Sequence, residues 1–502
     1  MANYLYDSVF GKFLDSDKPF LITPHGNMSY AEFSAQTNRI ANCLTASGVK
    51  PGDRVAVQAE KSVSQLALYA ATIKAGGIYL PLNTGYTPLE LDYFLKDAKP
   101  AIIVVSQTVQ ETIESFAKTL NAALLTLNHD GTGTLNAQAN EASQQFDTVA
   151  RDSEDLAAIL YTSGTTGRSK GAQICQRNLV SNAQVLADAW QFTADDTLLH
   201  MLPIYHTHGL FVACNLLAIV GGSMIFLPKF SVENVLTWMP QATTMMGVPT
   251  FYTRLLDSEK FTRKASAHVR LFISGSAPLL ADTHKRFEAR TGQLILERYG
   301  MTETNMSTSN PYDAARLAGT VGQALPGVNL RIVDTQTGKP VPTGEIGIIE
   351  LKGDNVFLGY WEMAEKTAES FREDGYFITG DMAQQDENGY VTIVGRDKDL
   401  IISGGLNIYP KEVEAMIDEL DGVVESAVIG VPHKDFGEGV VAVVVASDRK
   451  LSGEHITKFL KDKIAKFKQP KEVFFVTSLP RNTMGKIQKT ELRKTYANVF
   501  IS

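Results

Sequence analysis

Cysteine is scarce in this 502-residue chain, and no strong excess of charge favours either sign. The three cysteines, Cys43, Cys175 and Cys214, lie far apart and form no CxxC pair. This pattern argues against a disulfide framework or a zinc cluster, and it fits a reducing compartment, so we expect a cytoplasmic location. The formal net charge of -8 provides no attraction for nucleic acid or an anionic membrane, and we expect neither as a partner.

One uncharged segment, residues 210–227, is long enough to suggest a membrane span. Polar residues and glycines interrupt it from Asn215 onward, so a buried helix, a Gly-Gly turn and a buried strand over 224–227 explain it better. The first twenty residues include acidic side chains, so we expect neither a signal peptide nor a transit peptide there.

Strands and helices alternate in the first third of the chain. Apolar runs predict strands over 55–57, 78–80 and 102–105. Ser62 is placed to cap the first intervening helix, and Pro88 suits the first turn of the second. A β-α-β-α-β order of this kind predicts a parallel, doubly wound sheet, and similar alternation returns over residues 156–308.

The pattern then changes twice. Short β-rich runs with glycine-containing turns over residues 321–394 predict a small antiparallel unit. After Arg396, expected strands near 400–402, 424–431 and 440–445 and expected helices over 410–420 and 454–465 form an α+β unit of domain size. We therefore predict an α/β protein with a large N-terminal domain, residues 1–395, and a small α+β C-terminal domain, residues 396–502.

The sharpest local signal is YTSGTTGRSKG at residues 161–171, directly after an apolar run. Its glycines let the backbone approach a polyphosphate, its hydroxyls add donors, and Lys170 adds a positive charge. The alternative is a flexible surface turn. It is not the P-loop of NTPases, because that loop needs Gly before the lysine and Ser or Thr after it, whereas here Ser169 precedes and Gly171 follows.

This segment resembles the signature loop of the adenylate-forming superfamily, which includes acyl- and aryl-CoA synthetases, luciferases and peptide-synthetase adenylation domains. Five further segments resemble the superfamily's motifs in its order: LPIYHTHG at 202–209, ERYGMTE at 297–303, TGD at 379–381, GRDKDL at 395–400 and PRNTMGK at 480–486. The resemblance covers nearly the whole chain and implies a large N-terminal domain followed by a small mobile one, which agrees with the expected boundary.

The resemblance implies that Mg²⁺ and ATP adenylate a carboxylic acid and that coenzyme A then takes the acyl group. It makes Lys486 the catalytic lysine, Thr302 an α-phosphate contact, and Glu303 and Thr165 the metal ligands. His206 would gate or orient the acyl group, although a lone histidine could equally be packing. The nucleotide-binding residues implied are Thr162, Ser163, Gly164, Thr165, Thr166, Gly167, Lys170, Gly275, Ser276, Ala277, Tyr299, Gly300, Met301, Asp381 and Arg396.

The second step involves the small domain. By resemblance, Lys398 is the hinge between domains, and Gly404 and Gly405 line the tunnel for the thiol of CoA after rotation. Lys486, if exposed, would also be a target for a lysine acyltransferase.

Two arginines suggest which acid is activated. Arg298 precedes the adenine motif and Arg254 lies in VPTFYTRLL, beside the expected acyl pocket, with Ser276 completing its polar end. A buried guanidinium without a partner is costly, so these residues imply a second carboxylate on the substrate. Three stretches, PIYHTHGLF, VPTFYTRLL and LERYGMTETNM, resemble the malonate-activating members of the family. The alternative is that both arginines point away from the pocket, one to solvent and the other to a structural acid such as Glu297.

We therefore expect malonate, ATP and CoA to yield malonyl-CoA, AMP and diphosphate through a malonyl-adenylate, with methylmalonate as a second substrate. One alternative is a CoA synthetase for another short acid, and another is an adenylation enzyme that loads a carrier protein. A luciferase-like oxygenase would share only the first step. A non-catalytic nucleotide sensor is disfavoured because Glu303 and Lys486 are both present.

Overall fold

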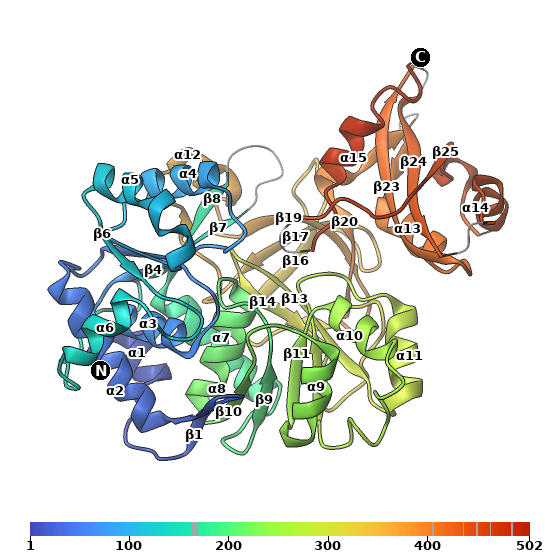
Figure 1. The fold of residues 1–502 in the computed structure, drawn as a ribbon. Coiled ribbons are helices and arrows are strands. Elements are labelled where there is room, and N and C mark those ends of the chain that lie inside the picture. Colours follow the sequence, from blue (N-terminus) through green and yellow to red (C-terminus); the bar gives the residue numbers. More distant parts are fainter. Residues whose placement is uncertain are drawn as a thin grey trace. The chain divides into compact units, whose positions relative to one another are not determined.

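The computed structural model describes residues 1–162, 169–403, 406–434, 436–447, 450–461, 463–482 and 485–501 (Figure 1). It separates into two compact units. The first comprises residues 1–318, 322–329 and 351–377, and the second comprises residues 319–321, 330–350 and 378–502. The mixed α/β architecture is confirmed, with extensive sheets in the N-terminal part and a smaller α+β segment at the C-terminal end. The boundary between residues 395 and 396 stays a prediction.

A seven-stranded sheet in the first unit contains the expected β-α-β-α-β segment. The strand order is β18-β8-β7-β4-β3-β5-β6, and β4, β3, β5 and β6 run parallel. The strands are β3 (Arg54–Gln58), β4 (Ile78–Pro81), β5 (Ile102–Val105), β6 (Ala123–Thr126), β7 (Leu156–Thr162), β8 (Lys170–Cys175) and β18 (Gly359–Tyr360). Four helices accompany them: α3 (Val63–Lys74), α4 (Pro88–Ala98), α5 (Gln110–Leu120) and α6 (Thr134–Glu141).

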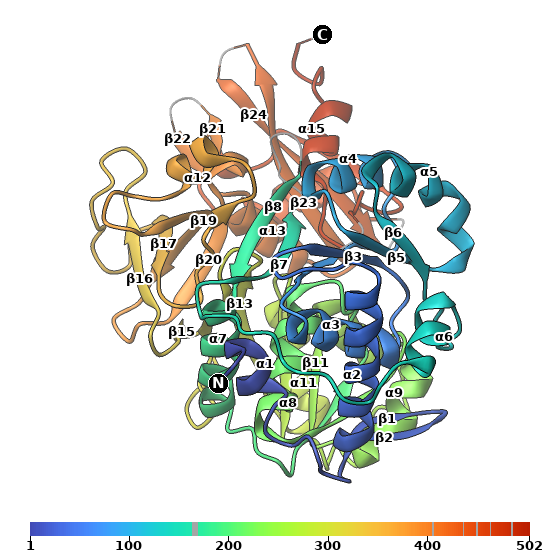
Figure 2. The same cartoon turned by 90° about the vertical axis from the view of Figure 1, so that its left-hand side faces the viewer.

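Local sequence explains the starts of these helices. The Ser62 side chain accepts a hydrogen bond from the backbone of Gln65 and so caps α3. Thr87 and Glu90 form a reciprocal capping box at the start of α4, where Pro88 occupies the first turn. Helices α2 (Tyr30–Ala46) and α3 lie side by side in both views (Figures 1 and 2).

A nine-stranded sheet forms the rest of the first unit's framework, in the order β15-β14-β13-β12-β11-β9-β10-β1-β2. The strands from β13 to β1 run parallel, whereas β14, β15 and β2 pair antiparallel. They are β1 (Pro19–Thr23), β2 (Gly26–Ser29), β9 (Thr197–His200), β10 (Ser223–Phe226), β11 (Thr244–Gly247), β12 (Leu271–Ser274), β13 (Ile295–Met301), β14 (Asn305–Ser309) and β15 (Gln323–Ala324).

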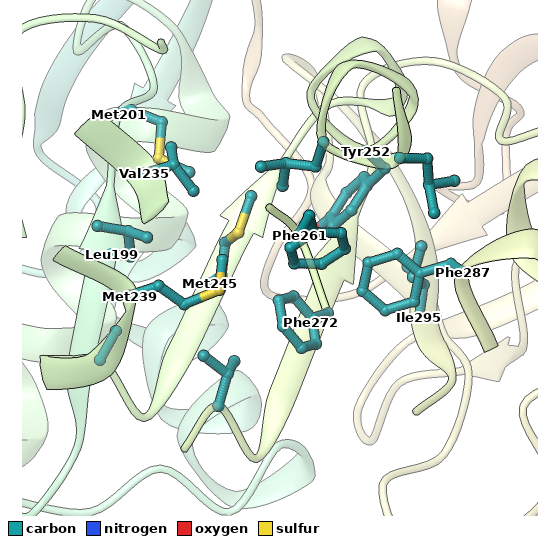
Figure 3. Packing of buried hydrophobic residues seen from close by; sticks show 14 of the residues in the cluster. Leu199, Met201, Val235, Met239, Met245, Tyr252, Phe261, Phe272, Phe287 and Ile295 are labelled. Carbon is teal, nitrogen blue, oxygen red and sulfur yellow. The ribbon is translucent and has the colours of Figure 1, made fainter. Parts of the chain in front are cut away.

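The helices of this part are α1 (Tyr4–Val9), α7 (Gln176–Ala189), α8 (Asn215–Val220), α9 (Val232–Trp238), α10 (Pro249–Leu256), α11 (Ala281–Thr291) and α12 (Ala364–Ser370). Aromatic rings hold α10 and α11 on the sheet (Figure 3). Tyr252, Phe261, Phe272 and Phe287 are fully buried, and the Phe272 and Phe287 rings meet edge to face with centroids 4.9 Å apart. Burying each such side chain contributes about 1.5–3 kcal/mol.

The uncharged segment 210–227 is a buried helix, a turn and a buried strand, as predicted. A π-helix, η2 (His208–Cys214), continues into α8, Gly221 turns the chain at φ +73°, and β10 follows. Within the described ranges, no helix has both the length and the apolar character needed to cross a membrane.

The second unit carries two sheets. One has the order β16-β17-β19-β20: β16 (Asn329–Val333), β17 (Gly347–Lys352), β19 (Phe377–Gln385) and β20 (Val391–Arg396). The other joins β21 (Ile401–Ser403), β22 (Leu406–Ile408), β23 (Val423–His433), β24 (Gly437–Ala446) and β25 (Glu472–Val476), with helices α13 (Pro410–Asp418), α14 (Gly453–Leu460) and α15 (Lys489–Thr495). The helix expected over 454–465 ends five residues early, and β25 and α15 were not predicted.

One buried carboxylate ties together the amino ends of the nine-stranded sheet. Asp196, just before β9, accepts hydrogen bonds from Arg270 Nη2 at 2.7 Å and Thr243 Oγ1 at 2.7 Å. These partners directly precede β12 and β11. Burial alone would raise the pKa of Asp196, but the hydrogen bonds from Arg270 and Thr243 outweigh it and hold the pKa below its usual value.

Asp196→Asn should therefore lower the free energy of unfolding by on the order of 3 kcal/mol at pH 7, because it leaves Arg270 without its counter-charge. Since the folded pKa is depressed, this stabilisation is complete above the unfolded pKa of about 4 and is lost as pH falls through the folded value. Denaturant titration from pH 7 to pH 3 should show the variant approaching wild type. The exposed neighbour variant Asp195→Asn is the control, and an equal loss there would contradict this account.

Candidate active site

The parallel strands of the nine-stranded sheet bring several predicted residues to one edge. The segment with His206 follows β9, α10 with Arg254 follows β11, and Gly275, Ser276 and Ala277 follow β12. Because β9, β11, β12 and β13 are parallel, their carboxyl ends share this edge. Ligands of open α/β sheets bind outside that edge, so the topology itself makes it a candidate site.

Arg298 is the buried cation of this edge. Its residue is only 4% exposed, and its Nε and Nη2 atoms have no hydrogen-bond partner among the described residues. The guanidinium lies across Gly275, where a Cβ would meet Arg298 Cζ at 2.3 Å. A glycine at position 275 therefore leaves the room that the guanidinium occupies.

The alternative pairing of Arg298 with Glu297 is not found in the described part of the chain. Successive residues of a strand point to opposite faces, so neighbours on β13 are poorly placed to pair. Burial lowers the pKa of Arg298 to about 9, which still leaves the side chain positively charged at neutral pH. A buried cation with donors unused is costly unless an anion binds to it.

His208 completes this cluster, and the sequence analysis missed it. Its Nδ1 lies 3.1 Å from Ser276 Oγ, and its Nε2 is buried without a hydrogen-bond partner among the described residues. Burial, reinforced by the charge of Arg298, keeps the pKa of His208 well below its usual value, so the ring is neutral. Ser276 has φ +69°, a left-handed conformation that is strained for a serine. The second histidine of HTHG was the available signal.

The two other residues predicted near this edge are His206 and Arg254. His206 is half-buried, and its ring packs against Tyr205 with centroids 4.5 Å apart. Arg254 is exposed on α10, whereas Tyr252 and Leu255 of the same helix are buried. No contact joins Arg254 to Arg298 in the described ranges, so a role for Arg254 rests on the sequence alone.

The segment predicted to bind phosphate connects two antiparallel strands, β7 and β8, rather than a strand and a helix as in a P-loop. Thr162 ends β7 and Lys170 begins β8, with Thr162 Oγ1 donating to the Lys170 carbonyl oxygen at 3.4 Å. The predicted ligands Ser163, Gly164, Thr165, Thr166 and Gly167 lie outside the described residues.

Lys170, Tyr360 and Glu303 form a contact chain beside this loop. Lys170 Nζ lies 4.1 Å from the centroid of the Tyr360 ring, and Tyr360 Oη donates to Glu303 Oε1 at 3.0 Å. Burial lowers the pKa of Lys170, and the charge of Glu303 opposes this effect. Glu303 is buried and Thr302 beside it is half-buried.

No cluster of three His, Cys, Asp or Glu side chains in the described residues could hold a metal alone. Mg²⁺ does not need one, because it commonly binds through one or two carboxylates plus phosphate oxygens. Glu303 fits that use, and Thr165 lies outside the described residues.

The expected adenine segment is the end of β13. Tyr299 and Met301 are half-buried, with Tyr299 Oη 3.9 Å from Met301 Sδ. At Gly300 a Cβ would lie 1.8 Å from the Asn305 carbonyl oxygen, so the close β13–β14 turn requires glycine there. The β13–β14 register shifts between Tyr299 and Gly300.

The remaining predicted residues belong to the second unit. Asp381 and Arg396 face each other on β19 and β20, with Arg396 Nε 2.5 Å from Asp381 Oδ1. Desolvation and the charge of Arg396 lower the pKa of Lys398 to about 8. Lys486 is exposed in a turn closed by two hydrogen bonds with Asn482, at 3.0 Å and 2.9 Å. Gly404 and Gly405 lie outside the described residues.

Comparisons with known proteins agree along the whole chain. Residues 14–361 match the model for AMP-binding enzymes, and residues 412–486 match the model for their C-terminal domain. A malonate–CoA ligase of Arabidopsis thaliana is 34% identical over 485 residues, covering 90% of this chain and 79% of that protein. A feruloyl-CoA synthase of an Amycolatopsis species is 35% identical over 481 residues, covering 94% and 95%. The crystal structure of ATP-bound MatB from Rhodopseudomonas palustris is 57% identical, covers 99% of this chain and 100% of that one, and superposes with a TM-score of 0.97.

Tyr360→Phe tests the Lys170–Tyr360–Glu303 chain. The variant keeps the ring beneath Lys170 but removes the hydrogen bond to the buried Glu303 carboxylate. We expect the KM for Mg-ATP to rise about 10-fold while the protein stays folded, since hydrogen bonds to charged groups are worth about 1.5–3 kcal/mol. Steady-state kinetics at varied Mg²⁺ would measure the change. Tyr6→Phe, another buried tyrosine, is the control, and an unchanged KM in Tyr360→Phe would refute a role at the nucleotide.

Proposed function

Because this chain belongs to the AMP-binding enzyme family, we propose that it is an ATP-dependent ligase that joins malonate to coenzyme A, releasing AMP and diphosphate. The buried Arg298, with two donor atoms unused among the described residues, carries this proposal. The malonate–CoA ligase from Arabidopsis thaliana and the MatB structure among its relatives support it.

The first step joins one malonate carboxylate oxygen to the α-phosphorus of ATP and breaks the bond to diphosphate. Charge develops on the α-phosphate and on the leaving diphosphate, so cations and hydrogen-bond donors lower the barrier. In the proposal Lys170 and Lys486 supply positive charge and Thr302 supplies a hydroxyl. Glu303 would hold Mg²⁺, which supplies further charge neutralisation. In the second step the CoA thiol attacks the acyl carbon and AMP leaves.

Asp381 and Arg396 bind the ribose in this proposal, and Tyr299 to Met301 flank the adenine. Lys398 acts as the hinge that lets the small domain serve both steps in turn. A lysine acyltransferase acting on Lys486 and a cytoplasmic location remain predictions from the sequence.

Arg298 explains why the acid would carry two carboxylates. One carboxylate of malonate reacts, and the second can accept paired hydrogen bonds from the guanidinium. Ser276 and the neutral His208 add polar groups at the same end. Acetate would leave Arg298 buried without an anion, and an aromatic acid such as the ferulate of the Amycolatopsis enzyme would place a ring against a cation that lacks its counter-charge. Methylmalonate keeps the second carboxylate and remains a second candidate substrate.

A panel of acids tests this function. Purified protein with ATP, Mg²⁺ and CoA should form malonyl-CoA, with AMP and diphosphate in equal amounts, and should use acetate and ferulate poorly. The kcat/KM for malonate should exceed that for acetate by roughly 30- to several-thousand-fold, which corresponds to about 2–5 kcal/mol for a buried charge pair. Preference for acetate or an aromatic acid would overturn the choice of malonate. Acyl transfer to a carrier protein but not to CoA would indicate a carrier-loading enzyme.

Arg298→Met isolates the specificity element. We expect kcat/KM for malonate to fall by about the same 30- to several-thousand-fold, while the KM for ATP stays near wild type. The ratio of kcat/KM for malonate to that for acetate should fall, because acetate no longer leaves a buried guanidinium unpaired. Arg316→Met is the matched control, since Arg316 is a half-buried arginine that donates to the backbone oxygens of Leu294 and Tyr312. Full malonate activity in Arg298→Met would contradict the proposal.

A further inference from the structure

A lysine outside the described site is held by three contacts at the carboxyl edge of the first unit's two sheets. Lys61 lies between β3 and α3, and its Nζ is 2.7 Å from His200 Nδ1 and 3.0 Å from the His200 carbonyl oxygen. The same Nζ lies 4.2 Å from the centroid of the Phe226 ring. Burial lowers the pKa of Lys61 well below its usual value, and in either protonation state the side chain has the two hydrogens that its contacts with His200 need.

The contacts of His200 define which of its nitrogens carries the proton. His200 is fully buried at the end of β9, and its Nε2 is 2.8 Å from the Gly209 carbonyl oxygen. A carbonyl can only accept, so Nε2 carries the hydrogen and Nδ1 accepts from Lys61. Burial and the nearby Lys61 keep the pKa of His200 well below its usual value, so the ring stays neutral.

The contacts from Lys61 through His200 to Gly209, here called the relay, lead to the cluster of Arg298, Ser276 and His208. Its carbonyl oxygen also accepts from Cys214 Sγ at 3.1 Å, and a Cβ at position 209 would lie 2.0 Å from the Pro203 carbonyl oxygen. The backbone here is therefore held on both sides. The preceding residue is His208, whose Nδ1 lies 3.1 Å from Ser276 Oγ and whose pKa is lowered by burial and by the charge of Arg298.

We propose that Lys61 and His200 are positioning residues that set the preference for a dicarboxylic acid by fixing the Gly209 backbone and, through it, His208. This inference rests on the proposed function, because it assigns a role to His208 in binding the second carboxylate. Without Lys61, the His200 ring can turn or change tautomer and present a lone pair to the Gly209 carbonyl. The His208 segment would then shift relative to Ser276 and Arg298.

Lys61→Met tests the relay, since it keeps the side-chain length and removes the donor. We expect kcat/KM for malonate to fall about 10- to 100-fold, mainly through a raised KM for malonate, because loss of a supporting hydrogen bond misplaces the group that it orients. The KM for ATP should stay near wild type, and discrimination between malonate and acetate should narrow. Simple destabilisation of the fold would not change selectivity.

Lys74→Met is the matched control. Lys74 is also a buried lysine of the first unit and also lies over an aromatic ring, with Nζ 4.8 Å from the centroid of Tyr6. It should lose comparable thermal stability while malonate selectivity is retained. Equal selectivity loss in both variants would overturn the inference, as would unchanged malonate kinetics in folded Lys61→Met.

Substitutions of His200 complete the test. His200→Gln can still donate to Gly209 and accept from Lys61, so it should keep most of the malonate activity and selectivity. His200→Phe should match Lys61→Met, and the double variant Lys61→Met, His200→Phe should lose no more than either alone, because both break one relay. Additive losses would refute the relay. Wild-type protein that prefers another acid would instead refute the proposed function, so the two failures are distinguishable.

Discussion

The cluster of Arg298, Gly275, Ser276 and His208, which we propose binds the acid, is built around a buried positive charge that the described protein residues do not neutralise. Arg298 lies across Gly275 with two donor atoms unused, and burial lowers its pKa only to about 9, so it stays charged. Burying this charge costs free energy, and an anion that binds to the guanidinium offsets that cost. The neutral His208 and the strained Ser276 lie in contact beside Arg298. Each adds a polar group to the cluster without adding a charge.

In the nine-stranded sheet, the contacts that stabilise the fold and the residues proposed to bind the acid lie at opposite ends of the parallel strands. At the amino ends of its parallel strands, Asp196 joins the segments before β9, β11 and β12. At their carboxyl ends lie His208 and Ser276, in the segments after β9 and β12, and Arg298 on β13. Between these two ends, aromatic side chains pack α10 and α11 against the sheet (Figure 3). The sheet is therefore held by contacts at the amino ends of its strands, while ligand-binding residues can lie at the carboxyl ends.

Most of the architecture was predictable because local patterns were consistent with it. The β-α-β-α-β segment, the Ser62 cap, the Pro88 helix start and the buried reading of residues 210–227 are all confirmed. The end of α14 was wrong by five residues, and β25 and α15 were missed. Short amphipathic segments at the edge of a small sheet depend on tertiary packing more than on their own periodicity.

The sequence by itself determined the family, the reaction class and the order of the motifs, because these depend on residue types at fixed spacing along the chain. Only the tertiary structure showed that Arg298 is buried beside His208 rather than paired with Glu297, that Arg254 is exposed, and that Lys61 reaches His200 from another sheet. Burial, side-chain direction and contacts between residues 139 positions apart arise from how the sheets pack, and no local pattern encodes them.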